Sequence, residues 1–183
     1  MFVGLLSDTH GVFSKEFADF LSPVDVIWHA GDWGGGLGFV QQIRDVKPVV
    51  GVYGNCDGLD IRDEFPEYHY FREEGLGILM THIGGSPGHF YPRAQELIRA
   101  CKPDVFVCGH SHILKVGWDE GAALGYASAK GAPPEEPAAS RPGFLYMNPG
   151  AAGLQGWQVV RTALRFKLQN GRVEDLEVFN LPR

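Results

Sequence analysis

The chain contains 183 residues, of which 44% are hydrophobic, and this length and composition suit one domain with an ordinary core. Its formal charge of −6 argues against a face for duplex nucleic acid, which needs clustered lysine and arginine. Three cysteines without a CxxC pair are typical of a reducing compartment. No apolar run has the length and flanks of a signal peptide or a membrane span. We therefore expect a single cytoplasmic domain over residues 1–183 without membrane contact.

The first third of the chain alternates apolar runs with amphipathic stretches. Buried strands are predicted for three continuous apolar runs, residues 2–6, 24–29 and 49–53. Apolar residues at helical spacing predict a helix of about two turns after Ser14, its expected N-cap, and a second helix that begins near Phe39 and ends before Pro48. This alternation predicts β-α-β units with parallel strands.

The rest of the chain is richer in hairpins. Residues 68–71 and 76–80 predict one hairpin, and Asn170-Gly171 predicts the turn of another between residues 157–168 and 172–179. A loop at 84–88, a helix at 91–101 and strands at 105–107 and 144–147 lie between these hairpins. Residues 119–143 are rich in Ala, Gly and Pro and predict a flexible surface insertion. Parallel units followed by antiparallel strands predict an α/β fold with two sheets.

Polar side chains that bind metal ions follow successive predicted strands. Alone, Asp8 or Asp32 is explained as a helix N-cap, Asn55 as part of a turn and His82 as a hydrogen-bonded core residue. Together they are harder to explain in this way, because open α/β sheets gather the ends of their strands into one crevice. One four-coordinate ion would leave several of them unused, so two ions sharing a carboxylate account better for the full set: Asp8, His10, Asp32, Asn55, His82, His110 and His112.

These residues form five ordered motifs, Asp8-x-His10, Gly31-Asp32, Gly54-Asn55, His82 and Gly109-His110-x-His112. The set resembles the calcineurin-like metallophosphoesterase superfamily, and most of all its small bacterial and archaeal phosphodiesterases of the YfcE type, which are relatives of the eukaryotic retromer subunit Vps29. The resemblance extends from the first strand to about Gly150. It implies a four-layer α-β-β-α sandwich of two mixed β-sheets with the site at the edge of the sheets.

The resemblance also implies how the ligands divide between two divalent ions. One ion would be held by Asp8, His10, Asp32 and His112, and the other by Asp32, Asn55, His82 and His110. The implied function is a two-metal-dependent phosphodiesterase, which hydrolyses a small phosphate diester by in-line attack of a metal-bridging hydroxide. Oxygen and imidazole donors suit Mn²⁺, the ion we expect, or Fe, Zn²⁺ or Ni²⁺ better than Ca²⁺.

One position departs from much of the superfamily. The residue after the motif asparagine is often a histidine that protonates the leaving group, whereas here it is Cys56, as in many small phosphodiesterases. A neutral thiol is a poor acid, so we predict substrates with good leaving groups, with His89 as a conceivable replacement acid. We expect Cys56 and Asp57 to be catalytic together with Asp32 and Asn55. Packing for Cys56 and turn formation for Asp57 are the alternatives.

Other functions compete with the phosphodiesterase. A scaffold resembling Vps29 would bind partner proteins with little or no catalysis, although seven competent ligands favour an enzyme. A phosphomonoesterase or a nuclease would use the same site, and the acidic composition disfavours the nuclease. The sequence leaves the physiological substrate and homo-oligomer formation open.

Overall fold

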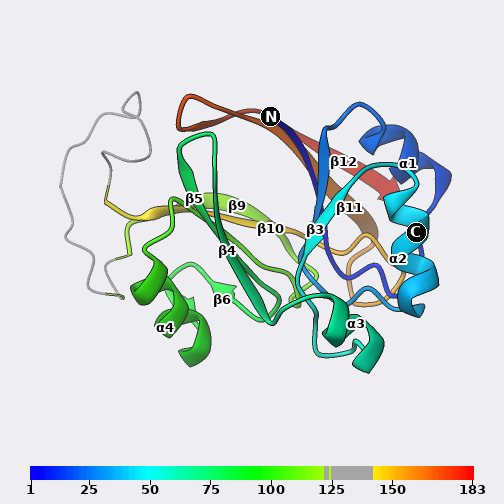
Figure 1. The fold of residues 1–183 in the computed structure, drawn as a ribbon, viewed down its shortest axis with the longest axis horizontal. Coiled ribbons are helices and arrows are strands. Elements are labelled where there is room, and N and C mark those ends of the chain that lie inside the picture. The colour runs from blue at the N-terminus through cyan, green and yellow to red at the C-terminus, as the bar shows by residue number, and fades with distance from the viewer. Residues whose placement is uncertain (122–123, 125–141) are drawn as a thin grey trace.

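A computed structural model describes residues 1–121, 124 and 142–183. Two five-stranded mixed β-sheets face each other, and helices cover their outer sides (Figure 1). The expected four-layer α-β-β-α sandwich is thereby confirmed. Most of the insertion predicted at residues 119–143 lies outside the described residues. No helix in the described ranges has the length and apolar character needed to cross a membrane.

The first sheet has the strand order β12-β11-β1-β2-β3. Its strands are β1 (Phe2–Leu6), β2 (Val26–His29), β3 (Val49–Gly51), β11 (Val160–Gln169) and β12 (Arg172–Pro182). β1, β2 and β3 run parallel, since the helices α1 (Lys15–Leu21) and α2 (Gly36–Arg44) connect them. The parallel register brings the carboxyl ends of these three strands to one edge of the sheet.

The second sheet has the order β4-β5-β8-β10-β9. Its strands are β4 (Tyr68–Glu73), β5 (Leu76–Thr81), β8 (Val105–Val107), β9 (Leu114–Asp119) and β10 (Phe144–Pro149). β5, β8 and β10 are parallel, and the chain passes from β5 to β8 through helix α4 (Pro92–Cys101). A short hairpin of β6 (Gly85–Ser86) and β7 (His89–Phe90) precedes that helix. The ends of β5 and β8 therefore also lie at one edge.

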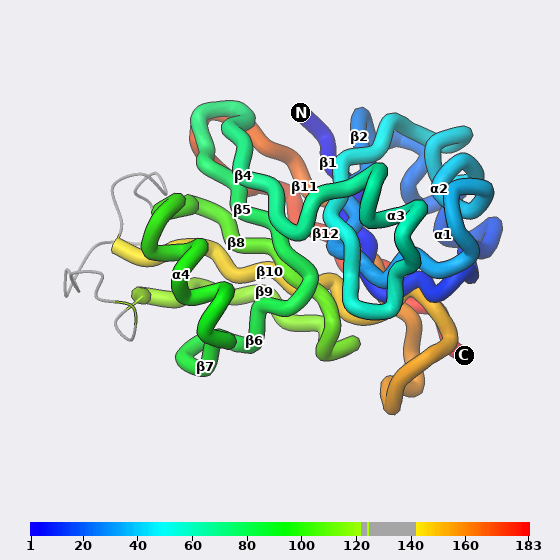
Figure 2. The backbone as a smooth tube through the Cα atoms, turned by 60° about the horizontal axis from the view of Figure 1, so that its bottom comes forward, coloured from blue at the N-terminus to red at the C-terminus, as the bar shows by residue number. Residues whose placement is uncertain are grey.

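The late strands complete both sheets. β11 lies beside β1, the first strand of the chain, and β10 lies between β8 and β9 (Figure 2). Residues from opposite ends of the sequence are therefore neighbours in the first sheet.

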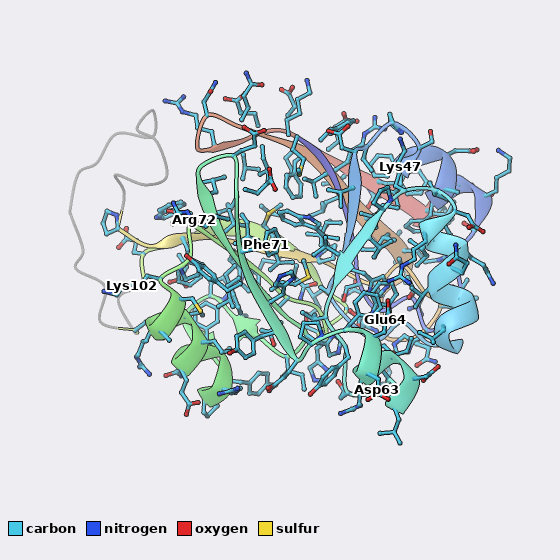
Figure 3. All side chains as sticks on the ribbon, viewed as in Figure 1. Lys47, Asp63, Glu64, Phe71, Arg72 and Lys102 are labelled. Atoms are coloured by element: carbon cyan, nitrogen blue, oxygen red, sulfur yellow. The ribbon has the colours of Figure 1, made fainter. Side chains whose placement is uncertain are left out.

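Three hydrophobic clusters correspond to the three interfaces between the four layers. Trp28 and Phe166 are fully buried between the sheets, where the ring of Phe71 meets Trp28 edge-on at 5.3 Å (Figure 3). A second cluster packs α1, α2 and the helix α3 (Leu59–Glu64) on the first sheet, and a third packs α4 on the second sheet. Aromatic residues thus fix the spacing of the sheets.

The structure differs from the sequence predictions in a few elements. β9 and α3 were not predicted, and β3 ends at Gly51 rather than at residue 53. The loop predicted at 84–88 carries β6 and its turn. α4 agrees with its prediction, with Pro92 in its first turn and Lys102 in a left-handed conformation at its end. Apart from the earlier end of β3, which precedes Asn55, none of these differences moves a strand end that carries a predicted ligand.

We predict that Phe166→Ala lowers the free energy of unfolding by about 3 to 5 kcal/mol, because it leaves a cavity between two sheets that cannot collapse onto it. Leu176→Ala, at a partly exposed position of β12, should cost less than about 1 kcal/mol. Urea unfolding followed by fluorescence measures both. Equal losses in the two variants would contradict the assignment of the sheet interface as the main core.

Candidate metal centre

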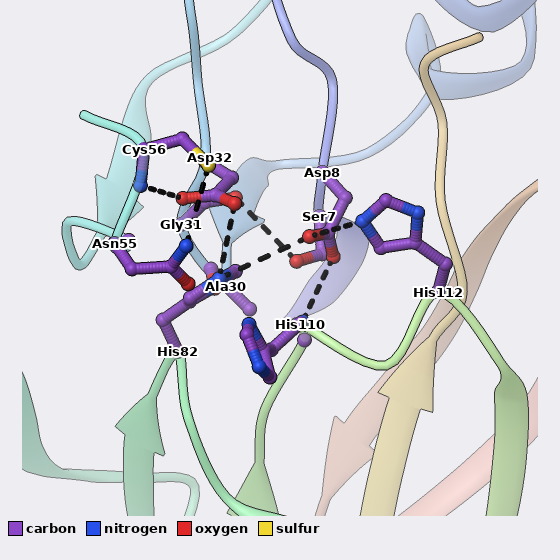
Figure 4. Close-up of polar contacts among 12 residues, drawn as sticks. Ser7, Asp8, Ala30, Gly31, Asp32, Asn55, Cys56, His82, His110 and His112 are labelled. Carbon is purple, nitrogen blue, oxygen red and sulfur yellow. Dashed lines mark hydrogen bonds and ion pairs between the residues drawn. The ribbon is translucent and has the colours of Figure 1, made fainter. Parts of the chain in front are cut away.

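The predicted ligands come from both sheets and converge at the edge where the parallel strands end (Figure 4). Asp8 follows β1, Asp32 follows β2, and His82 follows β5 directly. Possible ligand atoms lie within 4.8 Å of one another in three overlapping groups: Asp8, His10 and His112; His10, Asp32 and Cys56; and Asp8, Asp32 and His82. Together, the three groups contain five predicted metal ligands and Cys56.

The other two predicted ligands lie at the rim of this cluster. The ring of His110 is 5.3 Å from that of His82, and the His110 side chain is exposed. Asn55 is also exposed, and its amide nitrogen donates a hydrogen bond to the Cys56 sulfur at 3.3 Å. Both residues lie beside the buried group, on the side open to solvent.

Asp8 is the residue that joins the two sheets electrostatically. Its Oδ1 lies 3.1 Å from Nε2 of His112 and 3.9 Å from Nε2 of His82. Its Oδ2 accepts a hydrogen bond from the backbone nitrogen of His110 at 3.1 Å. A carboxylate from the first sheet thus contacts three histidines that the second sheet supplies.

Backbone carbonyls orient two of these histidines. Nδ1 of His82 donates to the carbonyl oxygen of Ala30 at 2.8 Å, and Nδ1 of His112 donates to that of Gln155 at 3.1 Å. Each bond keeps a proton on Nδ1, so Nε2, which faces the carboxylates, is the nitrogen that can bind either a second proton or a metal ion. Metal-binding histidines are commonly oriented in this way.

The glycine of each motif makes room for a ligand. A Cβ on Gly54 would overlap with Oδ1 of Asp32, and a Cβ on Gly109 would overlap with the Ser7 hydroxyl and lie 2.8 Å from Oδ2 of Asp8. Any larger residue would therefore displace a carboxylate. The glycines are required by close packing at these two positions and not by backbone conformation.

Backbone strain is concentrated at the same place. Nine non-glycine residues in the described ranges have a positive φ, and five of them are predicted ligands: Asp8, His10, Asp32, His110 and His112. This conformation costs about 1 to 2 kcal/mol per residue. Hydrogen bonds between neighbouring loops hold it, among them His10 N to Asp32 O at 3.1 Å and Gly109 N to His82 O at 3.0 Å. Such strain is typical of functional sites.

Two residues outside the predicted ligand set support the cluster. The buried Asp57 carboxylate accepts hydrogen bonds from the backbone nitrogens of Gly54 at 2.7 Å and Trp33 at 2.8 Å. It ties the loop after β2 to the loop after β3, and its catalytic role stays a prediction. Asn148 donates a hydrogen bond to the Gly109 carbonyl oxygen at 2.9 Å. This bond fixes the loop that carries His110 and His112.

His29 shows how a buried histidine near the site differs from a ligand. Its Nδ1 accepts a hydrogen bond from Gly31 N at 3.2 Å, and its Nε2 donates to the Thr9 hydroxyl at 2.9 Å. Burial holds the pKa of His29 well below its usual range. Both nitrogens are used, so the residue stays neutral and has no free lone pair for an ion.

The charges of the cluster shift the pKa values of its members. Burial opposes ionisation of Asp32, but the hydrogen bond and charge of His82 and the Cys56 N–H hold the pKa of Asp32 below its usual range. The pKa of His82 is raised because Asp32 and Asp8 outweigh its burial, and the hydrogen bond to Asp8 raises the pKa of His112. The Asp32 carboxylate therefore stays ionised and attracts cations.

The donor set fits a metal ion. Apart from histidine–carboxylate ion pairs, three buried atoms of the cluster have no hydrogen-bond partner, namely Asp8 Oδ1, His10 Nε2 and His82 Nε2. All three belong to residues of the three overlapping groups. Buried polar atoms are normally paired, and unpaired ones facing two carboxylates are explained by a cation between them. Mixed oxygen and imidazole donors of this kind bind divalent first-row metals.

The four-layer fold and this cluster at the strand ends define a class of metal-binding phosphoesterases. The family model of the calcineurin-like phosphoesterase superfamily domain matches residues 1–171, and the chain belongs to that superfamily. The predicted family is therefore confirmed. A search of curated protein sequences found no match.

Several solved structures share the fold. A novel archaeal phosphodiesterase is 18% identical, with a TM-score of 0.64 over 99% of this chain and 100% of that one. Vps29 from Chaetomium thermophilum is 15% identical, with a TM-score of 0.67 over 99% and 97%. Wild-type Vps29 from Entamoeba histolytica, solved in complex with Zn²⁺, is 17% identical, with a TM-score of 0.61 over 98% and 99%. Identities this low establish the shared fold alone.

We predict that Gly54→Ala weakens metal binding at least about tenfold, because the added methyl group displaces the Asp32 carboxylate. Gly38→Ala is the matched control, since a Cβ there meets nothing within 4 Å and alanine suits its helix. Equilibrium dialysis with Mn²⁺ measures both affinities. Unchanged affinity in Gly54→Ala would show that Asp32 does not need its present position.

The pKa shifts predict a pH dependence. A histidine with a raised pKa stabilises the metal-free fold fully below its unfolded-state value of 6.5, and this contribution is lost as pH rises through the raised pKa. Metal ions compete with protons for the same nitrogens, so their effect has the opposite sign. We expect the increase in Tm on adding Mn²⁺ to be larger at pH 8 than at pH 6. An increase that is independent of pH would exclude His82 and His112 as ligands.

Proposed function

We propose that the protein is a two-metal-dependent phosphodiesterase. The observation that carries the proposal is the group of buried donor atoms without a hydrogen-bond partner on Asp8, His10 and His82, which gather beside the Asp32 carboxylate. Such a group has no evident structural purpose without cations, because each unpaired buried polar atom costs about 1 to 3 kcal/mol. Membership of the phosphoesterase superfamily supports the same proposal.

The proposed ligand sets follow the geometry of the cluster. Asp8, His10, Asp32 and His112 would hold one ion, and Asp32, Asn55, His82 and His110 would hold the other. Asp32 is the proposed bridge, since its Oδ2 lies 3.3 Å from Nε2 of His82 and 3.9 Å from Nε2 of His10, and these histidines belong to different sets. Asn55 and His110, at the open rim, complete the second set from the solvent side.

The chemistry divides between the ions and the chain. When bound, two dications would activate a water nucleophile and neutralise charge on the phosphoryl group. Asp8 and Asp32 would hold the ions, and the positive charge of the ions would attract an anionic ester locally although the net charge of the chain is −6. Mn²⁺ is the proposed ion, and the Zn²⁺ complex of Entamoeba histolytica Vps29 supports zinc as an alternative.

Cys56 determines which leaving groups suit the site. Desolvation and the neighbouring Asp32 carboxylate raise the pKa of the Cys56 thiol to about 11, so the side chain stays uncharged at neutral pH. Cys56 N donates to Oδ1 of Asp32 at 2.8 Å, which places this residue beside the proposed bridge. An uncharged thiol is a weak proton donor, and substrates with good leaving groups remain our expectation.

Protein binding is the second candidate function, because Vps29 structures superpose on this chain as well as the archaeal phosphodiesterase does. On this fold a scaffold would bind partners without using the donor cluster. Loss of one metal ligand should therefore abolish the activity of an enzyme but leave partner binding by a scaffold unchanged.

We expect Mn²⁺-dependent hydrolysis of bis-p-nitrophenyl phosphate, faster than that of p-nitrophenyl phosphate. His112→Ala should lose bound metal together with at least about 99% of the activity, because an ion deprived of a ligand is held and oriented poorly. His69→Ala, on the half-buried face of β4, is the matched control and should retain both.

The possible outcomes separate the functions. Metal-loaded protein that hydrolyses neither ester would contradict the enzyme and favour the scaffold. Faster hydrolysis of the monoester would replace the diesterase with a phosphomonoesterase. Measuring Mn²⁺, Zn²⁺ and Ni²⁺ in parallel identifies the ion that supports the highest rate.

A further inference from the structure

Three hollows open beside the proposed metal ligands within the described residues, and two of them share a wall. The larger, of about 700 Å³, is lined by His110 and its neighbours, and the smaller, of about 260 Å³, is lined by Asn55 and His82. Tyr91 is half exposed and lines both hollows, so its side chain forms a wall that they share. A phosphoryl group at the ligand cluster would therefore lie next to two separate spaces.

The larger hollow has a mainly apolar lining that carries one positive charge. Its walls come from the β6-β7 hairpin, β9 and β10, and its volume is ordinary for a small-molecule site. Lys115 is the only lysine or arginine in its lining. Its side chain is exposed, and within the described ranges it forms no ion pair. A ligand with an anionic group would find this cation available.

The arginines of the smaller hollow are already engaged. Arg62 donates to the carbonyl oxygen of Asp57 at 2.8 Å and lies over the Tyr53 ring at 4.6 Å. Arg93 pairs with Glu67 at 3.2 Å. Glu67 balances the charge of Arg93, and a carbonyl oxygen and a ring hold the side chain of Arg62 in place. The smaller hollow therefore offers less attraction for an additional anion than the larger one.

We infer that the two hollows bind the two organic arms of a phosphate diester, and that Lys115 selects a larger arm that itself carries an anionic group. The inference rests on the proposed phosphodiesterase and adds a substrate class to it: asymmetric diesters with one small arm and one large, anionic arm. A monoester has a single arm and leaves one hollow empty. The arrangement therefore gives a physical reason for preferring diesters.

Filling each hollow tests the first half of the inference. Ser86→Trp narrows the larger hollow and Ile83→Trp narrows the smaller one, while Ser86→Ala and Ile83→Val keep them open. We expect each tryptophan variant to lower kcat/KM for bis-p-nitrophenyl phosphate about tenfold or more relative to its control. One of the two tryptophan variants should leave kcat/KM for methyl p-nitrophenyl phosphate nearly unchanged, because the methyl arm still fits the narrowed hollow.

The controls separate this inference from the proposed function. Bound Mn²⁺ is measured in every variant and should not change. If the wild-type protein hydrolyses neither diester, the proposed function fails before the hollows are tested. If the wild type is active and both tryptophan variants stay within about twofold of their controls, or slow the bis and methyl esters equally, the assignment of two arms is overturned.

Removing the charge of Lys115 tests the second half. Inhibition by thymidine 3′,5′-bisphosphate is compared with inhibition by thymidine 5′-monophosphate at fixed ionic strength. The wild type should prefer the bisphosphate about fivefold, as expected for one partly exposed ion pair, and Lys115→Gln should abolish this preference. Lys102→Gln, at the end of α4, removes an equal charge elsewhere and should retain it. An unchanged preference in Lys115→Gln would overturn the role of this lysine.

Discussion

The structure depends on bringing two buried carboxylates, Asp8 and Asp32, close together at the edge where two sheets meet. Like charges in such a place are unfavourable unless cations balance them, and the protein supplies imidazoles from the opposite sheet. The contact of Asp8 with His112 and with the backbone of His110 therefore serves both to join the sheets and to shape the site. Folding and cation binding use the same side chains, so the free energies of the two processes are linked.

This balance is obtained at a cost in backbone conformation. Residues such as His10 and His112 have left-handed conformations that β-carbons disfavour, and loop-to-loop hydrogen bonds together with Asp57 and Asn148 hold them. The surrounding core is large and aromatic, and it gives the fold a reserve of stability against this strain. Stability is thus concentrated between the sheets, and strain at their edge.

The sequence predicts well that these polar side chains gather at one place, because each follows a continuous apolar run, and a buried strand leaves little freedom about where its polar end points. Their role as ligands stays a prediction. The same reasoning fails for α3, in which only Ile61 is buried, and for β9, where Gly117 interrupts the strand pattern. It also fails for Gln155, which orients His112 through a backbone carbonyl that every residue type possesses. Tertiary support of this kind has no compositional signature and requires the three-dimensional contacts.

The position of the late strands has a consequence for synthesis. All seven predicted ligands precede residue 113, yet β1 is flanked by β11 and β8 by β10, which follow them in the chain. During translation the Asp-x-His and His-x-His segments therefore leave the ribosome before either sheet is complete. Free divalent ions can bind these segments while they are still unfolded, and binding to the unfolded chain reduces the net stabilisation that the ions give to the native state. Because of this strand order, ions that arrive during translation meet an unfolded chain, whereas ions that arrive after translation meet the folded site.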